Sequence, residues 1–245
     1  MPHAVDVLGS LSIVIPAYNA ARHLAATVGE VRRYLGDQSL PHEIVVVDDG
    51  SRDRTAEIAA ALPDVTLLRF PANRGKGAAV RTGLLAARRD WVLFMDADNS
   101  TRIIHLERFV RSAGDADVLI ASRRLEESRI VRPQPAFRQW LGRTFPAIVR
   151  AVALPEIRDT QCGFKLFRRP VAHALAARQT VERFCFDVEL LLIARAQGYR
   201  VVEVPINWDN PTDSTLSVFP DAPRMLWDLM RITWRDRIGG YRETG

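Results

Sequence analysis

Short apolar runs alternate with stretches of helical periodicity through the first hundred residues of the chain. Four runs predict buried strands, and they span residues 11–16, 43–47, 65–70 and 91–95. Between them, apolar residues recur at helical spacing and predict helices over residues 20–35, 55–62 and 76–88. Strands that alternate with helices of this length indicate βαβ units and a largely parallel sheet.

The second half of the chain has a less regular pattern. Strands are predicted over residues 118–121, 164–167 and 201–204, and helices over residues 137–154, 186–197 and 219–237. There is no internal repeat and no low-complexity segment. We therefore predict a single α/β domain over residues 1–218, followed by a basic amphipathic helix within residues 219–245.

Charge and cysteine content narrow the classes of function. A formal net charge of +5 on 245 residues suits a phosphorylated substrate, an anionic bilayer or a nucleic acid. No nucleic-acid-binding motif or long basic run is present, which argues against the last of these. Two isolated cysteines, Cys162 and Cys185, form no disulfide framework and favour a reducing cytoplasm.

The sequence offers no segment that would span a membrane. The N-terminus lacks the pattern of a secretory signal, and no apolar run reaches the roughly 18 residues that a spanning helix needs. We expect a cytoplasmic protein whose membrane contact, if its substrate requires one, is peripheral and on the inner face.

Paired carboxylates follow two of the predicted strands. Asp48 and Asp49 come directly after residues 43–47, and Asp96 and Asp98 come directly after residues 91–95. Ligands of parallel sheets bind beyond the carboxyl ends of the strands, where these four acids would repel one another. A Mg2+ or Mn2+ ion, which prefers oxygen ligands, would relieve that repulsion. The alternative is a turn and helix cap at residues 48–51, and this alternative is weaker for Asp96 and Asp98.

A glycine-rich segment lies between the two acid pairs. It reads Asn73-Arg74-Gly75-Lys76-Gly77 and opens a predicted helix. Backbone amides and the positive charge of Lys76 at a helix N-terminus suit a phosphate, although a simple glycine turn fits the pattern as well. The spacings of a P-loop and of a dinucleotide fingerprint are both absent, which argues against an oxidoreductase.

Seven blocks of the chain resemble inverting glycosyltransferases of family 2, the group with the GT-A fold. In order they read LSIVIPAYNA, EIVVVDDGSRDRT, NRGKGAAVRTG, FMDADNST, ASRR, IRDTQCGFKLFRR and VERFCFDVELLLIARAQGY. The last two closely resemble the dolichyl-phosphate β-glucosyltransferase branch and look less like dolichyl-phosphate mannose synthases. The resemblance covers residues 11 to 235, and blocks in a shared order are far more specific than any single block.

The resemblance implies a fold and an activity. The fold is a GT-A-type, Rossmann-like mixed sheet, mainly parallel, flanked by helices and followed by a C-terminal amphipathic helical appendage. The activity is metal-dependent transfer of a hexose from a nucleotide diphosphate sugar to a polyprenyl or dolichyl phosphate, with inversion and with UDP-glucose as the favoured donor. The alternatives are GDP-mannose as the donor, a soluble glycan as the acceptor, and, more remotely, a non-catalytic nucleotide-sugar-binding protein.

The resemblance also assigns residues. Together with the glycine-rich segment it gives a nucleotide-sugar site of eight residues: Pro16, Tyr18, Val47, Asp48, Asp49, Lys76, Asp96 and Ala97. Asp96 and Asp98 match the pair that binds the metal and, through it, the diphosphate. The remaining catalytic candidates are Arg123, which matches a phosphate-contacting arginine, and Asp187, which falls on the acceptor side. Two further acceptor-side candidates complete the set: Arg138 and Gln161.

The chain departs from the family pattern at three places. Ala20 stands where the family commonly has an acid, so that one contact to the nucleoside is missing. Thr215, within Ser-Thr-Leu, stands where the branch usually has a lysine, and Arg224 is a candidate to replace that basic contact. Members of this branch often begin with a membrane-spanning helix, which this chain does not show.

The proposed acceptor sets the chemistry that the enzyme must perform. A phosphate monoester has a second pKa of about 6 and is already an anionic nucleophile at neutral pH, so it needs little help from a general base. Positioning the acceptor and stabilising the leaving diphosphate are the remaining tasks. Direct displacement inverts the anomeric centre, so an α-linked donor gives a β-linked product.

Two arginine-rich helices are candidates for contact with the bilayer. Residues 137–154 and 219–238 combine aromatic and aliphatic side chains with several arginines, among them Arg231, Arg235 and Arg237. Such helices suit an anionic membrane surface. Amphipathic helices that pack on a sheet have the same composition, so both interpretations stay open at the level of sequence.

Overall fold

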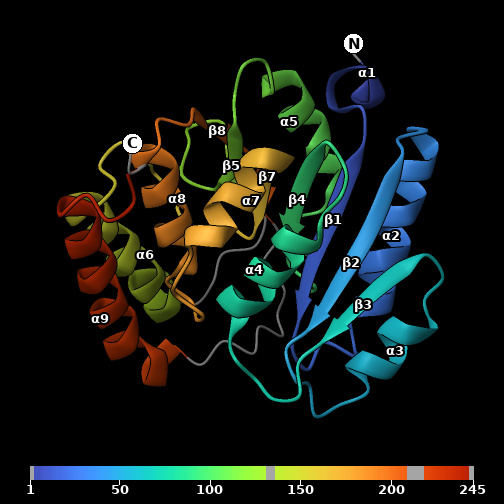
Figure 1. The fold of residues 1–245 in the computed structure, drawn as a ribbon, viewed down its shortest axis with the longest axis horizontal. Helices are drawn as coiled ribbons and strands as arrows, with labels where there is room; N and C mark the ends of the chain where they lie inside the picture. Colours follow the sequence, from blue (N-terminus) through green and yellow to red (C-terminus); the bar gives the residue numbers. More distant parts are fainter. Residues whose placement is uncertain (1–2, 131–135, 209–217, 243–245) are drawn as a thin grey trace.

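A seven-stranded mixed sheet forms the centre of the molecule (Figure 1). The computed structural model describes the backbone of residues 3–130, 136–208 and 218–242, and the side chains of residues 3–128, 144–207 and 222–242. The strand order is β3-β2-β1-β4-β7-β5-β8. The strands are β1 (Leu11–Ala17), β2 (His42–Asp48), β3 (Val65–Arg69), β4 (Trp91–Met95), β5 (Val118–Ser122), β7 (Phe164–Arg168) and β8 (Val201–Pro205). Short strands β6 (Arg129–Ile130) and β9 (Asn207–Trp208) pair separately.

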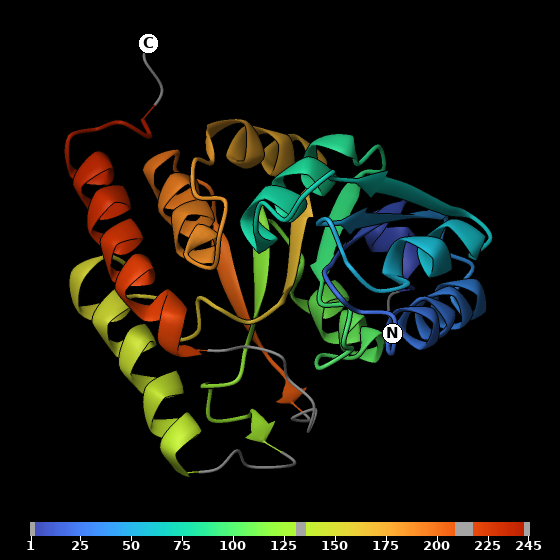
Figure 2. The same cartoon turned by 90° about the horizontal axis from the view of Figure 1, so that it is seen from below.

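Helices cover both faces of the sheet (Figure 2). One face packs against α1 (Ala4–Leu8), α2 (Leu24–Asp37), α3 (Thr55–Ala61), the 3-10 turn η1 (Ile103–His105) and α5 (Leu106–Ser112). The other face packs against α4 (Lys76–Ala86), α7 (Arg169–Arg178) and α8 (Phe186–Ala196). Two longer helices, α6 (Ala136–Val152) and α9 (Val218–Arg237), lie side by side beyond α8 in both views. Among the described helices, none is long and apolar enough to cross a bilayer.

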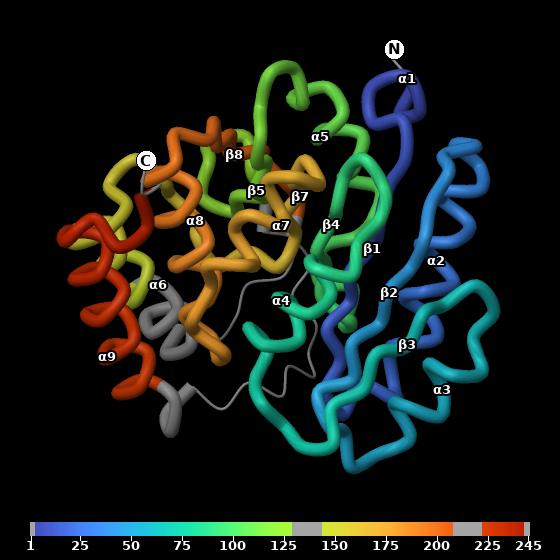
Figure 3. The backbone as a smooth tube through the Cα atoms, viewed as in Figure 1, coloured from blue at the N-terminus to red at the C-terminus, as the bar shows by residue number. Residues whose placement is uncertain are grey.

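One strand runs against the direction of its neighbours. The tube in Figure 3 shows β7 between β4 and β5, and it is antiparallel to both. Met95, the last residue of β4, therefore pairs with Phe164, the first residue of β7. This register brings the segment that precedes β7, residues 159–163, to the carboxyl end of β4, where Asp96 and Asp98 follow.

The predicted mixed, mainly parallel sheet is confirmed. All the strands and helices predicted from periodicity are present, with ends that differ by a few residues. The short helices α1, α5 and α7 were not predicted. The helix predicted from residue 20 begins at Leu24, and the backbone N–H groups of Ala20 and Ala21 in the loop before it donate to Thr55 Oγ1 and Asp53 Oδ2. The division of the chain at residue 218 stays a prediction.

The segment after α9 is fastened to α8 by a buried hydrogen bond. Tyr241 is fully buried, and its hydroxyl donates to Oε1 of Glu189, which is also fully buried, at 2.7 Å. The same carboxylate accepts the backbone N–H groups of Thr180 and Val181, so it joins the C-terminal segment to the loop before α8. The proximity of this carboxylate and the burial of the ring both raise the pKa of Tyr241, with burial the larger cause.

Tyr241→Phe is expected to lower the free energy of unfolding by about 2 kcal/mol, the range for a hydrogen bond to a charged group. The ring packing is retained, so the change isolates the hydroxyl. Urea denaturation of the variant and of wild type measures the difference. Tyr18→Phe is the matched control, because the Tyr18 side chain is exposed and its substitution should leave the midpoint unchanged. An unaltered midpoint for Tyr241→Phe would contradict the role given to this bond.

Candidate active site

The two acids after β4 are held by neighbouring elements on both sides. The backbone N–H of Asp96 donates to the carbonyl of Gly163 at 3.2 Å, which ties it to the start of β7. The hydroxyl of Thr27, on α2, donates to the carbonyl of Ala97 at 2.8 Å. Asp98 Oδ1 accepts the N–H of Ser100 at 3.0 Å. Asp96 and Asp98 are partly accessible to solvent, whereas Ala97 between them is buried.

A lysine from the glycine-rich segment neutralises one of these acids. Lys76 is the first residue of α4, and its Nζ lies 2.6 Å from Asp96 Oδ1. Burial by itself lowers the pKa of Lys76, but the carboxylates of Asp96 and Asp187 raise it by more, so the pKa lies above its ordinary value. The ammonium also lies 5.4 Å from the centre of the Phe94 ring. In this structure Lys76 occupies the position next to Asp96 that a cation would take.

A second, deeper ion pair lies behind the first. Lys165 is fully buried, donates from Nζ to the carbonyl of Cys162 at 2.6 Å and contacts Asp187 Oδ1. Burial raises the pKa of Asp187, and Lys165 and Lys76 oppose this only in part. The Lys165 ammonium lies 5.6 Å from the centre of the Phe94 ring, so two ammonium groups lie close to this ring. Each ammonium is paired with a carboxylate: Lys165 with Asp187, and Lys76 with Asp96.

Arg123 is held in one orientation by a buried aspartate. Its Nε and Nη2 donate to the two oxygens of Asp159 at 2.7 and 2.9 Å, and its backbone N–H donates to the same carboxylate. Glu203, on β8, accepts the N–H of Asp159 and holds the segment in place. Burial by itself lowers the pKa of Arg123, but the charge of Asp159 raises it by more, and Asp96 raises it further, so the pKa lies above its ordinary value. The guanidinium therefore stays charged beside the acids.

The predicted nucleoside residues lie at the ends of β1 and β2. Pro16 and Val47 are buried and pair across these strands, whereas Tyr18 is exposed just beyond β1. The Asp48 carboxylate is buried, with Oδ1 accepting the N–H of Ser51 and Oδ2 3.3 Å from Arg69 Nε. The contact with Arg69 is an ion pair without hydrogen-bond geometry, so Asp48 Oδ2 accepts no hydrogen bond from the described residues.

Asp49 holds the glycine-rich segment rather than facing open space. Its two oxygens accept the backbone N–H groups of Arg74 and Gly75 and the side-chain amide of Asn73, at 2.7 to 2.9 Å. Burial raises the pKa of Asp49 despite these bonds. The structure thus gives Asp49 a definite task, which is to place α4 and with it Lys76. Its contact with a nucleoside stays a prediction.

Sequence reasoning missed several residues that shape this site. Ser51 Oγ and Thr55 Oγ1 accept the N–H groups of Asn19 and Ala20, and so fix the loop after β1. Both hydroxyls lie in the block EIVVVDDGSRDRT, in which residues 48–51 were predicted to hold either the acids of a ligand site or a turn and helix cap. Asp159, Glu203 and Lys165 were also missed, because their partners lie far away in the sequence. Asp159 and Lys165 belong to the block IRDTQCGFKLFRR, but the block by itself does not show which side chains they meet.

The other predicted residues differ in how far the structure describes them. Gln161 is partly exposed and lies in the segment before β7, between Asp159, which pairs with Arg123, and Gly163, whose carbonyl accepts the N–H of Asp96. The side chain of Arg138 and the whole of Thr215 lie outside the described residues. Arg224 is exposed on α9. Burial raises the pKa of Asp228, and the charges of Arg231 and Arg224 oppose this only in part.

The acid pair fits a hard divalent cation. Among the described residues there is no group of three or more potential metal-binding side chains. Mg2+, however, usually takes only one or two carboxylates from a protein and its remaining ligands from water and substrate phosphates, and Mn2+ suits the same oxygen ligands. Two partly accessible carboxylates, one already neutralised by an ammonium group, match that requirement.

Comparisons with known proteins identify the family of the chain. The family model described as glycosyl transferase family 2 matches residues 12–175. The chain is 36% identical over 247 residues to a dolichyl-phosphate beta-glucosyltransferase of Trichomonas vaginalis, which is 95% of this chain and 75% of that protein. It is 33% identical over 250 residues to the human dolichyl-phosphate beta-glucosyltransferase, covering 95% of this chain and 77% of the relative.

Solved structures share the fold. A glucosyl-3-phosphoglycerate synthase from Mycobacterium tuberculosis, in complex with Mn2+, uridine-diphosphate-glucose and phosphoglyceric acid, matches with a TM-score of 0.70 at 16% identity, over 99% of this chain and 83% of that one. Because the family model spans well over half of the chain and the relatives align along nearly all of it, this protein belongs to glycosyl transferase family 2, alongside the dolichyl-phosphate beta-glucosyltransferases.

Proposed function

We propose that this enzyme transfers glucose from UDP-glucose to dolichyl phosphate or a related polyprenyl phosphate, with inversion at the anomeric carbon. The observation that carries the proposal is the convergence of Asp96, Asp98, Lys76 and Arg123 beyond the end of β4. The proposal draws its acceptor from relatives named for glucosyl transfer to dolichyl phosphate, which align along 95% of this chain. The donor is inferred from the UDP-glucose bound by the mycobacterial structure.

Asp96 and Asp98 would hold the divalent ion. A Mg2+ or Mn2+ ion bound there would supply Lewis-acid stabilisation of the negative charge that develops on the leaving diphosphate. Lys76 pairs with Asp96 in this structure. With Asp96 holding an ion, the ammonium of Lys76 would be available to bind a phosphate oxygen, and the N-terminus of α4 would add positive potential at the same place.

Arg123 and Asp187 have different tasks. Asp159 and Glu203 fix the guanidinium of Arg123, which suits it to orient an anionic phosphate without a loss of conformational freedom. Asp187 is buried against Lys165, so charge balance within the cluster fits its surroundings better than proton transfer. A phosphate acceptor is consistent with this, because its oxygen is already an anion at neutral pH.

A panel of donors and acceptors tests the proposed function. The full chain with Mn2+ is expected to transfer glucose from UDP-glucose to a polyprenyl phosphate, to leave the unphosphorylated polyprenol unused, and to lose activity on chelation. The anomeric proton signal of the product should show a β linkage. Transfer from GDP-mannose instead would establish the alternative donor, and transfer only to a soluble glycan would overturn the acceptor. We place the reaction on the inner face of the membrane, with the protein bound peripherally.

A further inference from the structure

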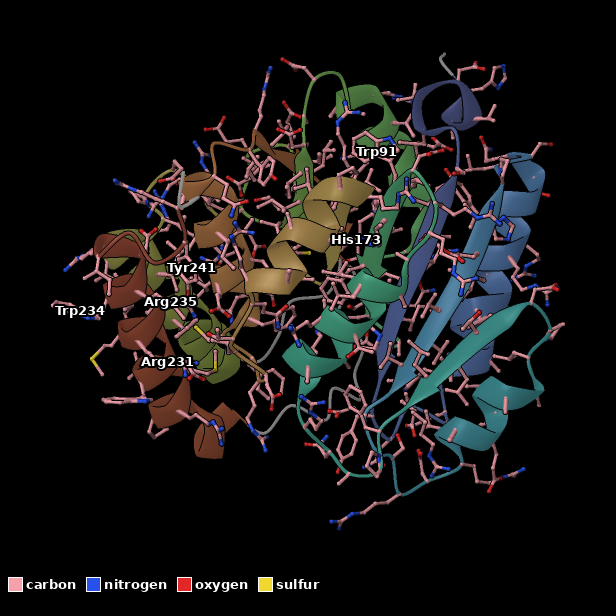
Figure 4. All side chains as sticks on the ribbon, in the orientation of Figure 1. Trp91, His173, Arg231, Trp234, Arg235 and Tyr241 are labelled. Atoms are coloured by element: carbon pink, nitrogen blue, oxygen red, sulfur yellow. The ribbon has the colours of Figure 1, made fainter. Side chains whose placement is uncertain are left out.

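The outer face of α9 exposes a row of large apolar side chains. Trp227, Met230, Trp234 and Ile238 are 59 to 66% exposed, and their spacing of three, four and four residues places them on one side of the helix. Leu229 and Ile232, on the opposite side, are buried in the core with α8. Figure 4 shows Trp234 pointing away from the body of the molecule. Five of the nine large apolar residues that are exposed in the described chain lie within residues 226–238.

The arginines of α9 flank this row instead of forming its centre. Arg235 places its guanidinium 4.9 Å from the centre of the Tyr241 ring, and Arg231 lies 3.8 Å from Asp228. Figure 4 shows both arginines on the side of Tyr241, away from Trp234. Membrane contact through Arg231, Arg235 and Arg237 stays a prediction, and Arg231 and Arg237 are exposed; the structure adds an exposed apolar row beside them.

We propose that the face formed by Trp227, Met230, Trp234 and Ile238 inserts into the interface of the bilayer that holds the acceptor. The proposal rests on the proposed function, because a polyprenyl tail keeps that acceptor in the membrane. Tryptophan favours the boundary between headgroups and acyl chains. Residues 218–242, which are α9 and the segment after it, hold five arginines and three aspartates, a formal charge of +2 that complements an anionic surface. A second copy of this chain is the competing occupant.

Binding to vesicles tests the insertion directly. Wild-type full-length protein is expected to sediment with vesicles of phosphatidylcholine and phosphatidylglycerol, and to remain partly bound at high salt because apolar insertion is not screened. Trp227→Gln combined with Trp234→Gln should lower the partition coefficient at least tenfold. The matched control is Leu85→Gln combined with Ile104→Gln, which removes two apolar side chains that are 42 and 44% exposed on other surfaces, and it should bind as wild type does.

Further measurements separate this inference from its alternatives. The tryptophan variant should retain transfer to a short, water-soluble prenyl phosphate while losing transfer to a long-chain acceptor in vesicles. Loss of transfer to every lipid phosphate, with vesicle binding intact, would overturn the proposed function and leave insertion standing. Vesicle binding that is unchanged in the tryptophan variant would overturn the insertion. A wild-type dimer that the same substitutions convert to monomer, without vesicle binding, would assign this face to self-association and overturn the proposal.

Discussion

Asp98→Asn is expected to lower the rate of glucosyl transfer by about 100-fold or more, because the amide removes one of the two charges that would hold the metal at the diphosphate. The fold should survive. Asp98 is partly accessible, and its hydrogen bond from the N–H of Ser100 can be accepted by the asparagine oxygen. Steady-state kinetics with UDP-glucose and polyprenyl phosphate measure the loss, and Mn2+ titration followed by electron paramagnetic resonance measures the affinity for the metal.

Asp64→Asn is the matched control for this substitution. The Asp64 side chain is 81% exposed and directly precedes β3, which β2 and β1 separate from β4 in the sheet, so the same chemical change there should leave turnover and Mn2+ affinity as in wild type. Chelation of wild type should reproduce the loss seen in Asp98→Asn. Full turnover of Asp98→Asn in the presence of Mn2+ would remove the metal-binding role from this acid pair.

Gly163→Ala is expected to lower transfer by roughly 100-fold while changing thermal stability little. A Cβ at position 163 would overlap the Asp96 carboxylate, which lies directly against the glycine. The carboxylate is the free end of a side chain, so it can turn aside at a small cost in folding free energy. Once it does so, it leaves both Lys76 and its predicted metal position, and a displacement of about 1 Å in a reacting assembly can reduce the rate about 100-fold.

Gly29→Ala provides the comparison, because nothing lies within 4 Å of a Cβ at that position and the residue is inside helix α2. Alanine there should leave activity unchanged and raise the melting temperature slightly, since it reduces the conformational freedom of the unfolded chain. Melting curves and Mn2+ titrations for both variants test the pair. Wild-type turnover and Mn2+ affinity in Gly163→Ala would show that the placement of Asp96 by β7 is unimportant.

The strands of the first half were predictable because their signal is local. The runs ending at Val47 and Met95 are buried on both sides, as the centre of a parallel sheet requires, so their apolar character is continuous. A strand end followed by paired acids then predicts where Asp96 and Asp98 lie, because parallel strands share one carboxyl edge. Helices α4 and α8 were predictable because their signal, apolar residues at helical spacing, is also local.

The tertiary structure alone decided which side chains meet. Nothing local to residues 164–168 distinguishes an antiparallel strand from a parallel one, yet that direction brings Gly163 against Asp96. The pairs Arg123–Asp159 and Lys165–Asp187 join residues 36 and 22 positions apart, and their buried charges are stable only where both partners arrive together.

The C-terminal helix shows the same division. Its periodicity determines a helix on which arginines are interspersed with apolar residues at more than one angular position, because spacing along a helix fixes angular position. Its contacts with α8 and Tyr241 decide that Leu229 and Ile232 are buried and that Trp227 and Trp234 are left facing outward. A helix with apolar residues around most of its circumference can bury either side, and only the surface it packs against selects which one.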